Sequence, residues 1–299
     1  MSILAFDIGG TNLRSALHVA DGSLTSRREV PTPTSGPDAF VTGLILEARA
    51  QIEAAAATPA ETPTAIGLAM AGYTDTRTGR VYDSPSLGLS DTLVGPPLTD
   101  ALGLPVRLVN DVNAAAYAEA QSVGAHDLIA LLVGTGVGTG MVSSGTLVEG
   151  HRGMAAEGGH VIWREAGLPC DCGMHGCYQA YLGGNSLARR AAEAGLTADA
   201  AALFAADRDG DERAAPIVTD ALAAMTSLCR LLVTLFDPER LVIAGGVGMN
   251  TPELMEAAQR ALDPHPLAHH AGAIPVLPAS HGADAGLLGA ALLARAASA

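Results

Sequence analysis

The apolar and polar positions of the chain change period repeatedly, as in a mixed α/β protein. Short apolar runs bounded by glycine indicate strands, and apolar residues that recur every three or four positions indicate helices. For the first third of the chain, the pattern predicts strands over 3–8, 13–20 and 24–30, a helix over 37–56, a strand over 65–72, and loops with a short hairpin over 72–99.

The first series closes with a strand over 105–110 that runs directly into a helix. A second series of elements follows. The pattern then predicts two strands within 128–150, helices over 184–236, a strand over 240–246, a helix over 252–262, a strand over 274–280 and a closing helix over 283–297. The two series are similar in design, so we interpret the chain as two βββαβα-like halves that meet near residue 111.

Composition narrows the classes of function. The 299 residues allow one large domain or two of ordinary size, and 48% hydrophobic residues are enough for a substantial core. Acidic residues number 31 against 17 basic ones, which gives a net charge of -14. Nucleic acids require a positive footprint, so we expect no nucleic-acid partner. A polyanionic ligand should instead be held by backbone amides or through Mg²⁺.

The sequence predicts a cytoplasmic protein. The N-terminal run lacks a basic region and is interrupted at Asp7, unlike a signal peptide. Uncharged apolar runs near 18 residues are missing from the sequence, so we expect no membrane span. The cysteine spacing does not suggest a disulfide framework, which favours a reducing compartment.

Three of the four cysteines lie within eight positions. Cys170, Cys172 and Cys177 have a C-x-C-x4-C spacing, and His160 stands ten residues upstream of the first. Thiolates and a neutral imidazole are donors that Zn²⁺ prefers, and four of them close a tetrahedral structural site. The alternative is three unconnected buried thiols. The clustering favours structural Zn²⁺, and a metal on one nitrogen of His160 would aim the other at a ligand.

Four polar residues are candidates for a substrate site. Asn110 and Asp111 stand where a strand ends and a helix begins, which is where open α/β sheets place their ligands. The alternative is that one of them only caps the helix. Glu157 and Gln179 flank the cysteine segment and can hydrogen-bond to a polar substrate, although Glu157 alone could be a solvated surface carboxylate.

Two glycine-rich hairpins are candidates for phosphate binding. Gly9–Thr11 follows the first strand, with Asp7 beside it to hold Mg²⁺ through water. GTGVGTG at 134–140 joins two later strands and contains the same residue types. A glycine hairpin is more often only a turn, but two of one design strengthen the interpretation. A further pair, Gly245 and Gly246, ends a strand and allows a flat ring or ribose to lie against the backbone.

Six motifs follow one another along the chain: DIGGTN at 7–12, NDVNAAA at 110–116, VGTGVGTG at 133–140, EGGH at 157–160, CDCGMHGC at 170–177 and AGGV at 244–247. With these motifs the chain resembles, over essentially its whole length, the ROK family of repressors, open reading frames and sugar kinases. The match is strongest to the bacterial glucokinase-like branch of that family.

The resemblance implies the two-domain, ribonuclease H-like α/β ATPase fold of actin and hexokinase, with a cleft between the domains. Residues 1–110 plus about 284–299 would form a small N-terminal domain, and 111–283 a large domain that carries the zinc motif. The resemblance also implies an ATP-dependent kinase, using Mg²⁺, that phosphorylates the 6-hydroxyl of glucose or of a glucose-like amino or N-acetylated sugar. It implies a homodimer as well.

The family's functional residues map onto this chain by motif. Asp111 would be the general base. Asn110, Glu157 and His160 would bind the sugar, and His160 would share the zinc with the three clustered cysteines. A family glutamate that contacts the sugar is replaced here by Gln179, which puts the identity of the sugar in question. The residues implied to bind the nucleotide and its Mg²⁺ are Asp7, Gly9, Gly10, Thr11, Asn12, Thr135, Gly136, Gly138, Gly245 and Gly246.

Two other classes of function are alternatives to a kinase. A sugar-binding sensor or regulator of the same family would lack kinase activity. Family repressors carry an N-terminal helix-turn-helix, and DIGGTN begins at residue 7, so we expect none here. A zinc-ribbon interaction module would need neither Asn110 and Asp111 nor the glycine hairpins.

Overall fold

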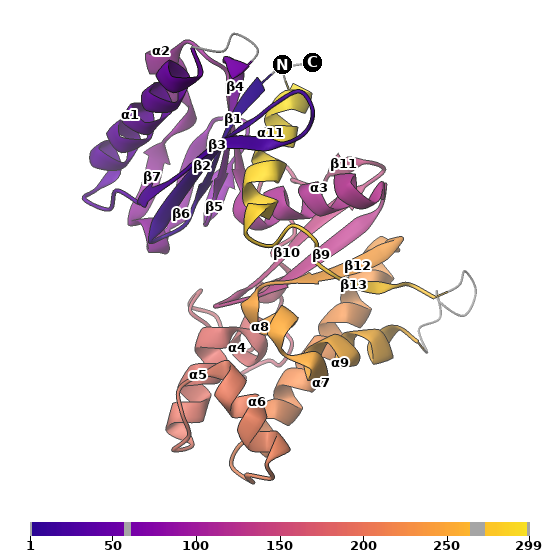
Figure 1. The fold of residues 1–299 in the computed structure, drawn as a ribbon. Coiled ribbons are helices and arrows are strands. Elements are labelled where there is room, and N and C mark those ends of the chain that lie inside the picture. Colours follow the sequence, from indigo (N-terminus) through magenta and orange to yellow (C-terminus); the bar gives the residue numbers. More distant parts are fainter. Residues whose placement is uncertain (1, 57–60, 264–272, 298–299) are drawn as a thin grey trace. The chain divides into compact units, whose positions relative to one another are not determined.

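The computed structural model (Figure 1) describes residues 2–56, 61–263 and 273–297. It divides into two compact units. The first unit contains Met1–Gln121, Leu147–Ala155 and Ala283–Ala299, and the second contains Ser122–Thr146 and Ala156–Gly282. Residues 111–121 and 147–155 therefore belong to the first unit, whereas the resemblance assigned them to the large domain.

The first unit is built on a five-stranded sheet. Its strands are β1 (Ser2–Ile8), β2 (Asn12–His18), β3 (Leu24–Pro31), β4 (Pro63–Met70) and β8 (Val106–Asn110), in the order β3-β2-β1-β4-β8. β1 pairs antiparallel with β2 and parallel with β4, which pairs parallel with β8. All seven residues of β1 are buried, as expected at the centre of a sheet that is covered on both faces. The five strands predicted for this region are confirmed.

Helices cover both faces of this sheet. They are α1 (Pro37–Ala55), α2 (Gly95–Leu102), α3 (Asp111–Val123) and α11 (Ala285–Ala297). Figure 1 shows α1 and α2 on one face, and α11 with α3 on the other. A Cβ added to Gly67 of β4 would stand only 2.1 Å from the carbonyl oxygen of Ala290. The sheet and α11 thus pack backbone against backbone, which only small residues allow.

The stretch 72–99 is more regular than the sequence indicated. It forms a three-stranded antiparallel sheet of β5 (Tyr73–Asp75), β6 (Arg80–Ser84) and β7 (Leu89–Leu93), followed by the start of α2. A short 3-10 helix, η2 (Pro85–Leu87), connects β6 to β7. The prediction of loops with one short hairpin was wrong here, because strands of three to five residues between turn residues leave little periodicity to detect.

The sheet of the second unit repeats the order of the first. Its strands are β9 (Leu128–Val133), β10 (Val137–Ser143), β11 (Thr146–Leu147), β12 (Arg240–Ala244) and β13 (Val276–Pro278), in the order β11-β10-β9-β12-β13. β9 pairs antiparallel with β10 and parallel with β12, and β12 pairs parallel with β13. Each sheet therefore has an antiparallel meander extended by two parallel strands, which confirms the repeat inferred from the hydrophobic pattern.

The second unit contains most of the α-helices that the structure describes. They are α4 (Gln179–Leu182), α5 (Gly184–Glu193), α6 (Ala200–Arg208), α7 (Ala215–Phe236), α8 (Gly246–Asn250) and α9 (Pro252–Leu262), together with the 3-10 turn η3 (Gly158–His160). A second 3-10 turn, η4 (Gly282–Asp284), begins at the last residue of this unit and continues into the first. Within the described part of the chain, only α7 is long and apolar enough to cross a membrane. Half of its most apolar stretch is buried, and Asp220 on this helix binds Arg164 and Arg190, as in the core helix of a globular unit.

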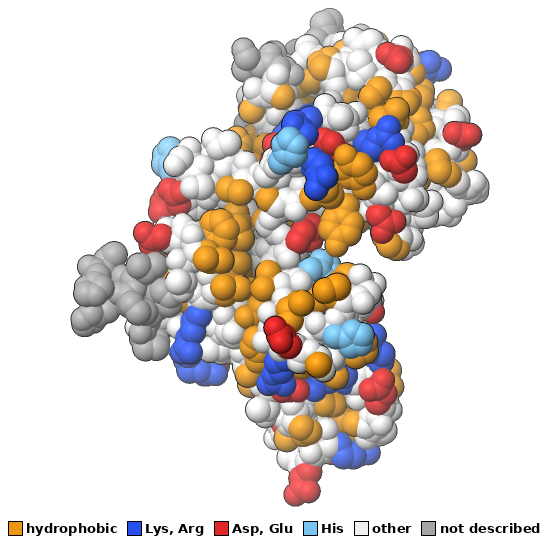
Figure 2. Space-filling model, turned by 180° about the vertical axis from the view of Figure 1, so that it is seen from behind, with side chains coloured by type: hydrophobic (Ala, Val, Ile, Leu, Met, Phe, Trp, Pro, Cys, Tyr) orange, Lys and Arg blue, Asp and Glu red, His pale blue; other side chains and the backbone are white. Residues whose placement is uncertain are grey.

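The charged surface is mixed. On the face shown in Figure 2, Arg side chains stand beside Asp and Glu rather than forming one broad basic area. Ion pairs of this kind include Arg80 with Asp91 and Arg208 with Glu253. Exposed pairs add little to stability, so they bear on the electrostatic field of the surface more than on the fold.

Candidate active site

The parallel strands of the first unit end side by side. Ile8 of β1 pairs with Met70 of β4, and Met70 pairs with Asn110 of β8. Asp7 lies one residue before this row and Asp111 one residue after it. The carboxyl ends of parallel strands are where open α/β sheets bind ligands. The sheet thus brings together the DIGGTN and NDVNAAA motifs, which are far apart in the sequence.

Asp7 is a buried carboxyl group in a strongly charged setting. Burial raises its pKa to about 6, although the Arg14 guanidinium acts in the opposite direction. Arg14 forms an ion pair with Asp7 and also donates to the carbonyl oxygen of Ala283 at 2.7 Å. A Cβ on Gly286, at the start of α11, would lie 2.6 Å from Asp7 Cγ. A glycine is therefore needed there to make room for the carboxylate.

Sequence reasoning missed two charged neighbours of Asp7. Arg14 is its antiparallel partner on β2, and the negative charge of Asp284 raises the pKa of Asp7 further. Arg27 binds Asp284 with Nη2 to Oδ2 at 2.9 Å. The only signal for Arg14 is that it is the one Arg, Lys, Asp or Glu residue in the predicted strand. Asp284 gives none, because its proximity depends on how the closing helix packs.

Asn110 and Asp111 stand at the N-terminus of α3. Asn110 Oδ1 accepts from the backbone N–H groups of Val112 (2.9 Å) and Asn113 (3.1 Å), while its Nδ2 donates to the carbonyl oxygen of Gly72 (3.2 Å). Asn110 is therefore the N-cap, which was one of the two alternatives for this pair.

The Asp111 side chain makes different contacts from that of Asn110. Its Oδ1 accepts from the N–H of Val112 at 2.9 Å, which orients the carboxyl group, and Oδ2 can still accept a proton. The surrounding protein displaces water from this carboxyl and raises its pKa. A carboxylate whose pKa is raised toward neutrality is a better proton acceptor than an ordinary aspartate.

The first glycine turn, Gly9–Thr11, is held by hydrogen bonds that its carbonyl groups accept from Thr32. Thr32 donates from Oγ1 to the carbonyl oxygen of Gly9 (2.7 Å) and from its N–H to that of Thr11 (2.9 Å). A Cβ on Gly10 would lie 2.8 Å from the carbonyl oxygen of Ser86. Thr11 is exposed, and Asn12, also exposed, donates to Glu29 Oε1 at 2.6 Å. The turn is thus fixed by hydrogen bonds and close packing, and it carries exposed hydroxyl and amide groups near Asp7.

The second glycine turn is shorter than predicted. It comprises Gly134–Gly136, closed by a hydrogen bond from Gly134 N to Gly136 O at 3.0 Å. The rest of GTGVGTG belongs to β10, where Gly138 pairs with Leu132, so Gly138 is a strand residue rather than a turn residue. EGGH packs closely on β10 through its own glycines, because a Cβ on Gly159 would lie 2.0 Å from Val137 O. Thr135 is exposed at the tip of the turn.

Gly245 and Gly246 lie beside this second turn, as a link between β12 and α8. Gly245 has a φ of +82°, and a Cβ there would lie 2.5 Å from the carbonyl oxygen of Val133. Gly246 begins α8, and a Cβ on it would meet nothing within 4 Å. Only the first of the two glycines is thus required by the fold, and the open space at the second could admit a ligand.

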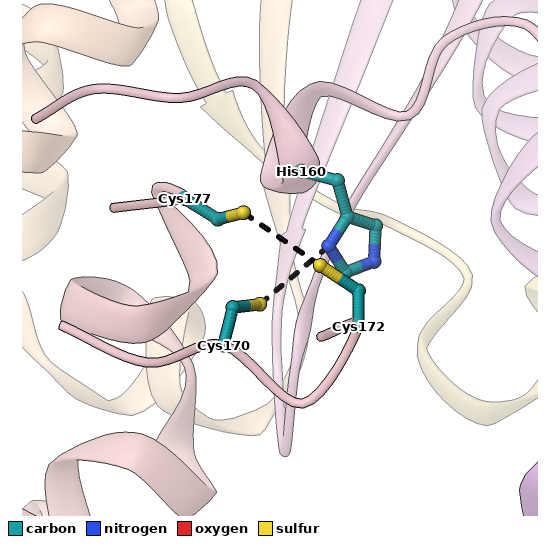
Figure 3. Close-up of side chains that lie close together, drawn as sticks. All are labelled: His160, Cys170, Cys172 and Cys177. Carbon is teal, nitrogen blue, oxygen red and sulfur yellow. Dashed lines mark hydrogen bonds between the residues drawn. The ribbon is translucent and has the colours of Figure 1, made fainter. Parts of the chain in front are cut away.

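The four predicted zinc ligands converge (Figure 3). One ligand atom from each of His160, Cys170, Cys172 and Cys177 lies within 4.8 Å of all the others. Cys170 Sγ is 3.7 Å from His160 Nδ1, and Cys172 Sγ is 3.7 Å from Cys177 Sγ. In a tetrahedral site with Zn–S bonds of about 2.3 Å, neighbouring ligand atoms stand about 3.8 Å apart. The residues therefore fit a structural Zn²⁺ ion, and we name these four the metal knot.

The turns of the metal knot depend on glycine. Gly173 and Gly176 have φ values of +87° and +82°, and a Cβ on Gly176 would collide with the carbonyl oxygen of Arg164 at 1.7 Å. Burial, together with the neighbouring thiols, raises the pKa of Cys177 to about 12. A bound cation would reverse that effect, because thiolates are the form that binds metal.

Two polar candidates adjoin the metal knot. Glu157 directly precedes η3, whose first turn closes with a hydrogen bond from His160 N to Glu157 O at 3.0 Å. Gln179, which begins α4, is half-buried, and its Oε1 accepts from the N–H of Val137 at 3.1 Å. Figure 3 shows the second ring nitrogen of His160 on the side of the ring away from the sulfur atoms. Glu157, His160 and Gln179 thus all belong to the second unit and lie in or beside the segment that forms the metal knot.

Comparison with known proteins identifies the family of the chain. The model of the ROK family matches residues 3–297. An N-acetylmannosamine kinase from Shigella flexneri is 34% identical, with 99% of each chain covered.

Two solved structures extend the comparison. A ROK hexokinase from Thermus thermophilus is 34% identical with a TM-score of 0.87, covering 100% of this chain and 99% of the other. A ROK glucokinase from Streptomyces griseus, solved in complex with glucose and AMPPNP, is 28% identical with a TM-score of 0.76. This match covers 99% of this chain and 100% of the glucokinase chain.

Proposed function

Because the chain belongs to the ROK family, with the actin and hexokinase type of fold, we propose that it is an ATP-dependent sugar kinase that phosphorylates the 6-hydroxyl of a hexose. The observation that carries the proposal is the junction of β8 and α3. There Asn110 caps the helix, and Asp111 keeps an oriented carboxyl group of raised pKa at the ligand edge of the sheet. Three relatives named as sugar kinases support the same class of reaction.

Asp111 is the proposed general base. The sugar oxygen forms a bond to the γ-phosphorus of ATP, the bond to the β–γ bridging oxygen breaks, and ADP leaves. The hydroxyl proton passes to Asp111. A primary alcohol is a weak acid, so its proton must be accepted by a carboxylate within hydrogen-bond reach. Phosphoryl transfer otherwise needs positioning and charge neutralisation more than covalent help.

The two glycine turns are the proposed holders of the nucleotide phosphates. Thr11 and Thr135 stand exposed at their tips, next to backbone amides suited to anions. Bound Mg²⁺ would supply the positive charge that the phosphates need, and Asp7, acting through water, is its proposed anchor in this chain. Gly245 and Gly246 complete the proposed nucleotide site beside the second turn.

The sugar is proposed to be glucose or a glucose-like hexose, with amino and N-acetylated forms included. Asn110, Glu157, His160 and Gln179 are its proposed ligands together with Asp111. The relatives act on different hexoses by name, N-acetylmannosamine and glucose, so family membership does not choose between them. A site built to hydrogen-bond one substituent can reject an analogue that lacks it by about 10⁴-fold.

A coupled ADP-release assay with Mg·ATP tests the proposal. The panel comprises glucose, mannose, fructose, glucosamine, 3-amino-3-deoxyglucose, N-acetylmannosamine and N-acetylglucosamine. We expect sustained turnover on one or more of these sugars. Silence across the panel, with sugar binding still measurable by calorimetry, would contradict the kinase and favour a sugar sensor of the same family.

A further inference from the structure

Gln179 lies between the metal knot and the second glycine turn. Its Oε1 accepts from the N–H of Val137, the residue that directly follows the turn Gly134–Gly136. Its Nε2 is directed at the sulfur of Cys170, with the two atoms 4.0 Å apart. One amide group therefore spans two structures that are separated by more than thirty positions in the sequence. Its space is closely confined, because a Cβ on Gly136 would stand 2.8 Å from Gln179 Oε1.

The other contacts of the turn come from α5. Gly184 N donates to the carbonyl oxygen of Gly134 at 2.9 Å, and Asn185 N donates to that of Thr135 at 3.0 Å. α5 thus holds the carbonyl groups of the turn, while Gln179 holds the N–H at its end. With these groups occupied, the N–H groups of Thr135 and Gly136 are the ones left to face a phosphate.

From this arrangement, we propose that Gln179 is a positioning residue that couples the metal knot to the phosphate-binding turn Gly134–Gly136. With Zn²⁺ bound, Cys170 would be held as a thiolate, which is a stronger hydrogen-bond acceptor than a thiol. The thiolate then fixes Nε2, and the planar amide fixes Oε1 on Val137. The proposal rests on the proposed function in one respect, because it takes the turn to bind nucleotide phosphate.

The replacement of the family's glutamate by glutamine is what makes this link available. A carboxylate could still accept from Val137, but it has no hydrogen to donate to sulfur. Its negative charge would also be repelled by a neighbouring thiolate. The amide satisfies both partners at once and keeps a second N–H on Nε2 for a sugar oxygen.

The first test measures zinc transfer from the loaded protein to a chromophoric chelator, with and without a saturating non-hydrolysable ATP analogue and Mg²⁺. If Gln179 couples the two sites, the nucleotide should slow zinc release about 5-fold or more in the unaltered protein. In Gln179→Leu the nucleotide should change the rate by less than about 2-fold. Equal slowing in both proteins would overturn the proposal.

Gln259→Leu is the matched control. Gln259 lies in the same unit, and its Oε1 likewise accepts from a strand N–H, that of Val276, at 3.3 Å. It has no contact with the metal knot, so zinc release from this variant should keep its full dependence on nucleotide. Loss of that dependence in Gln259→Leu would show that the effect follows general loosening of the unit, and would count against Gln179.

Gln179→Glu tests the contact with sulfur separately. Without nucleotide, this variant should release zinc about 10-fold faster, because outer hydrogen bonds to a metal ligand commonly change metal affinity by that factor or more. An unchanged rate would contradict the contact between Nε2 and Cys170.

Failure of the kinase proposal can be told apart from failure of this one. If calorimetry finds no nucleotide binding to the unaltered protein, the proposed nucleotide-binding role fails. The effect of Gln179 on the turn is then measured by amide hydrogen exchange of the peptide 134–140. In zinc-loaded Gln179→Leu that peptide should exchange faster than in the unaltered protein. Equal exchange rates in the two proteins would contradict the positioning role of Gln179 as well.

Discussion

The two glycine turns stand at equivalent places in two sheets of the same strand order, yet they are held by different means. In the first unit, Thr32 of the neighbouring segment binds the turn, and a charged pair of Asp7 and Arg14 lies beside it. In the second unit, the helix α5 and the amide of Gln179 bind the turn, and Gln179 also contacts Cys170 of the metal knot. The two units thus share one strand order, while the carboxyl groups of raised pKa, Asp7 and Asp111, belong to the first unit and the metal knot to the second.

This difference predicts that damage to each half will have distinct consequences. A change to Asp111 in the first unit should act on the chemical step. Changes to the metal knot in the second unit should act on the order of that unit and on binding.

The largest expected effect is that of Asp111→Asn. The amide keeps the size of the side chain but cannot accept the proton, so turnover should fall by roughly 10²-fold or more. Sugar and nucleotide affinities should stay within a few-fold, as measured by calorimetry. Ordinary turnover in this variant would remove Asp111 from the role of base.

The next largest effect is expected from the loss of one of the four predicted metal ligands. Cys177→Ser should lower the zinc content well below one ion per chain, reduce the thermal stability of the protein and weaken sugar binding through His160. Metal analysis, calorimetric scanning and sugar titration measure these three effects. Cys229→Ala is the control, because Cys229 is buried in α7 and is not one of the four clustered ligands. Unchanged sugar affinity in folded, zinc-free protein would leave the metal with a structural role alone.

A smaller effect is expected at the glycines beside the second turn. Gly245→Ala places a Cβ 2.5 Å from the carbonyl oxygen of Val133 on a backbone with positive φ, and should cost about 1–3 kcal/mol of unfolding free energy. Gly246→Ala meets nothing within 4 Å and should change the unfolding free energy by less than about 1 kcal/mol. Denaturant titration of both variants checks the difference. A larger stability loss in Gly246→Ala would contradict the packing described here.

The smallest effect concerns pH. The folded-state pKa of Asp111 is raised by desolvation, so the base is protonated at a higher pH than an ordinary aspartate of pKa 3.8. Turnover should therefore fall as the pH is lowered through this raised pKa, and recover above it. The residual turnover of Asp111→Asn should lack that acid limb. An identical acid limb in the variant would assign it to another group.

Local sequence signals predicted most of the fold. The strands and helices of both sheets follow from runs of apolar residues bounded by glycine, and α9 has the limits that its amphipathic pattern gave. The metal knot was predictable because its ligands are close in sequence and their spacing reflects the geometry of one ion. The zinc ion itself stays a prediction that the convergence of the four side chains supports.

Features that depend on long-range packing were not predictable. Arg14 and Asp284 reach Asp7 through strand pairing and through the docking of α11, which leave no local pattern. Gly138 was predicted to lie in a turn because glycine is common in turns, but it pairs with Leu132 and so belongs to the strand β10. Gln179 was singled out for its departure from the family, although its contacts with Val137 and Cys170 could be seen only in the folded chain.

The most direct test of the central claim follows the phosphate itself. Phosphorus NMR would monitor Mg·ATP with the preferred hexose from the panel, and in parallel with the 6-deoxy analogue of that hexose. The account predicts a hexose 6-phosphate signal that grows as ADP appears, and none with the 6-deoxy sugar. Growth of a sugar phosphate signal with the 6-deoxy analogue, or no transfer to any hexose that binds, would contradict it.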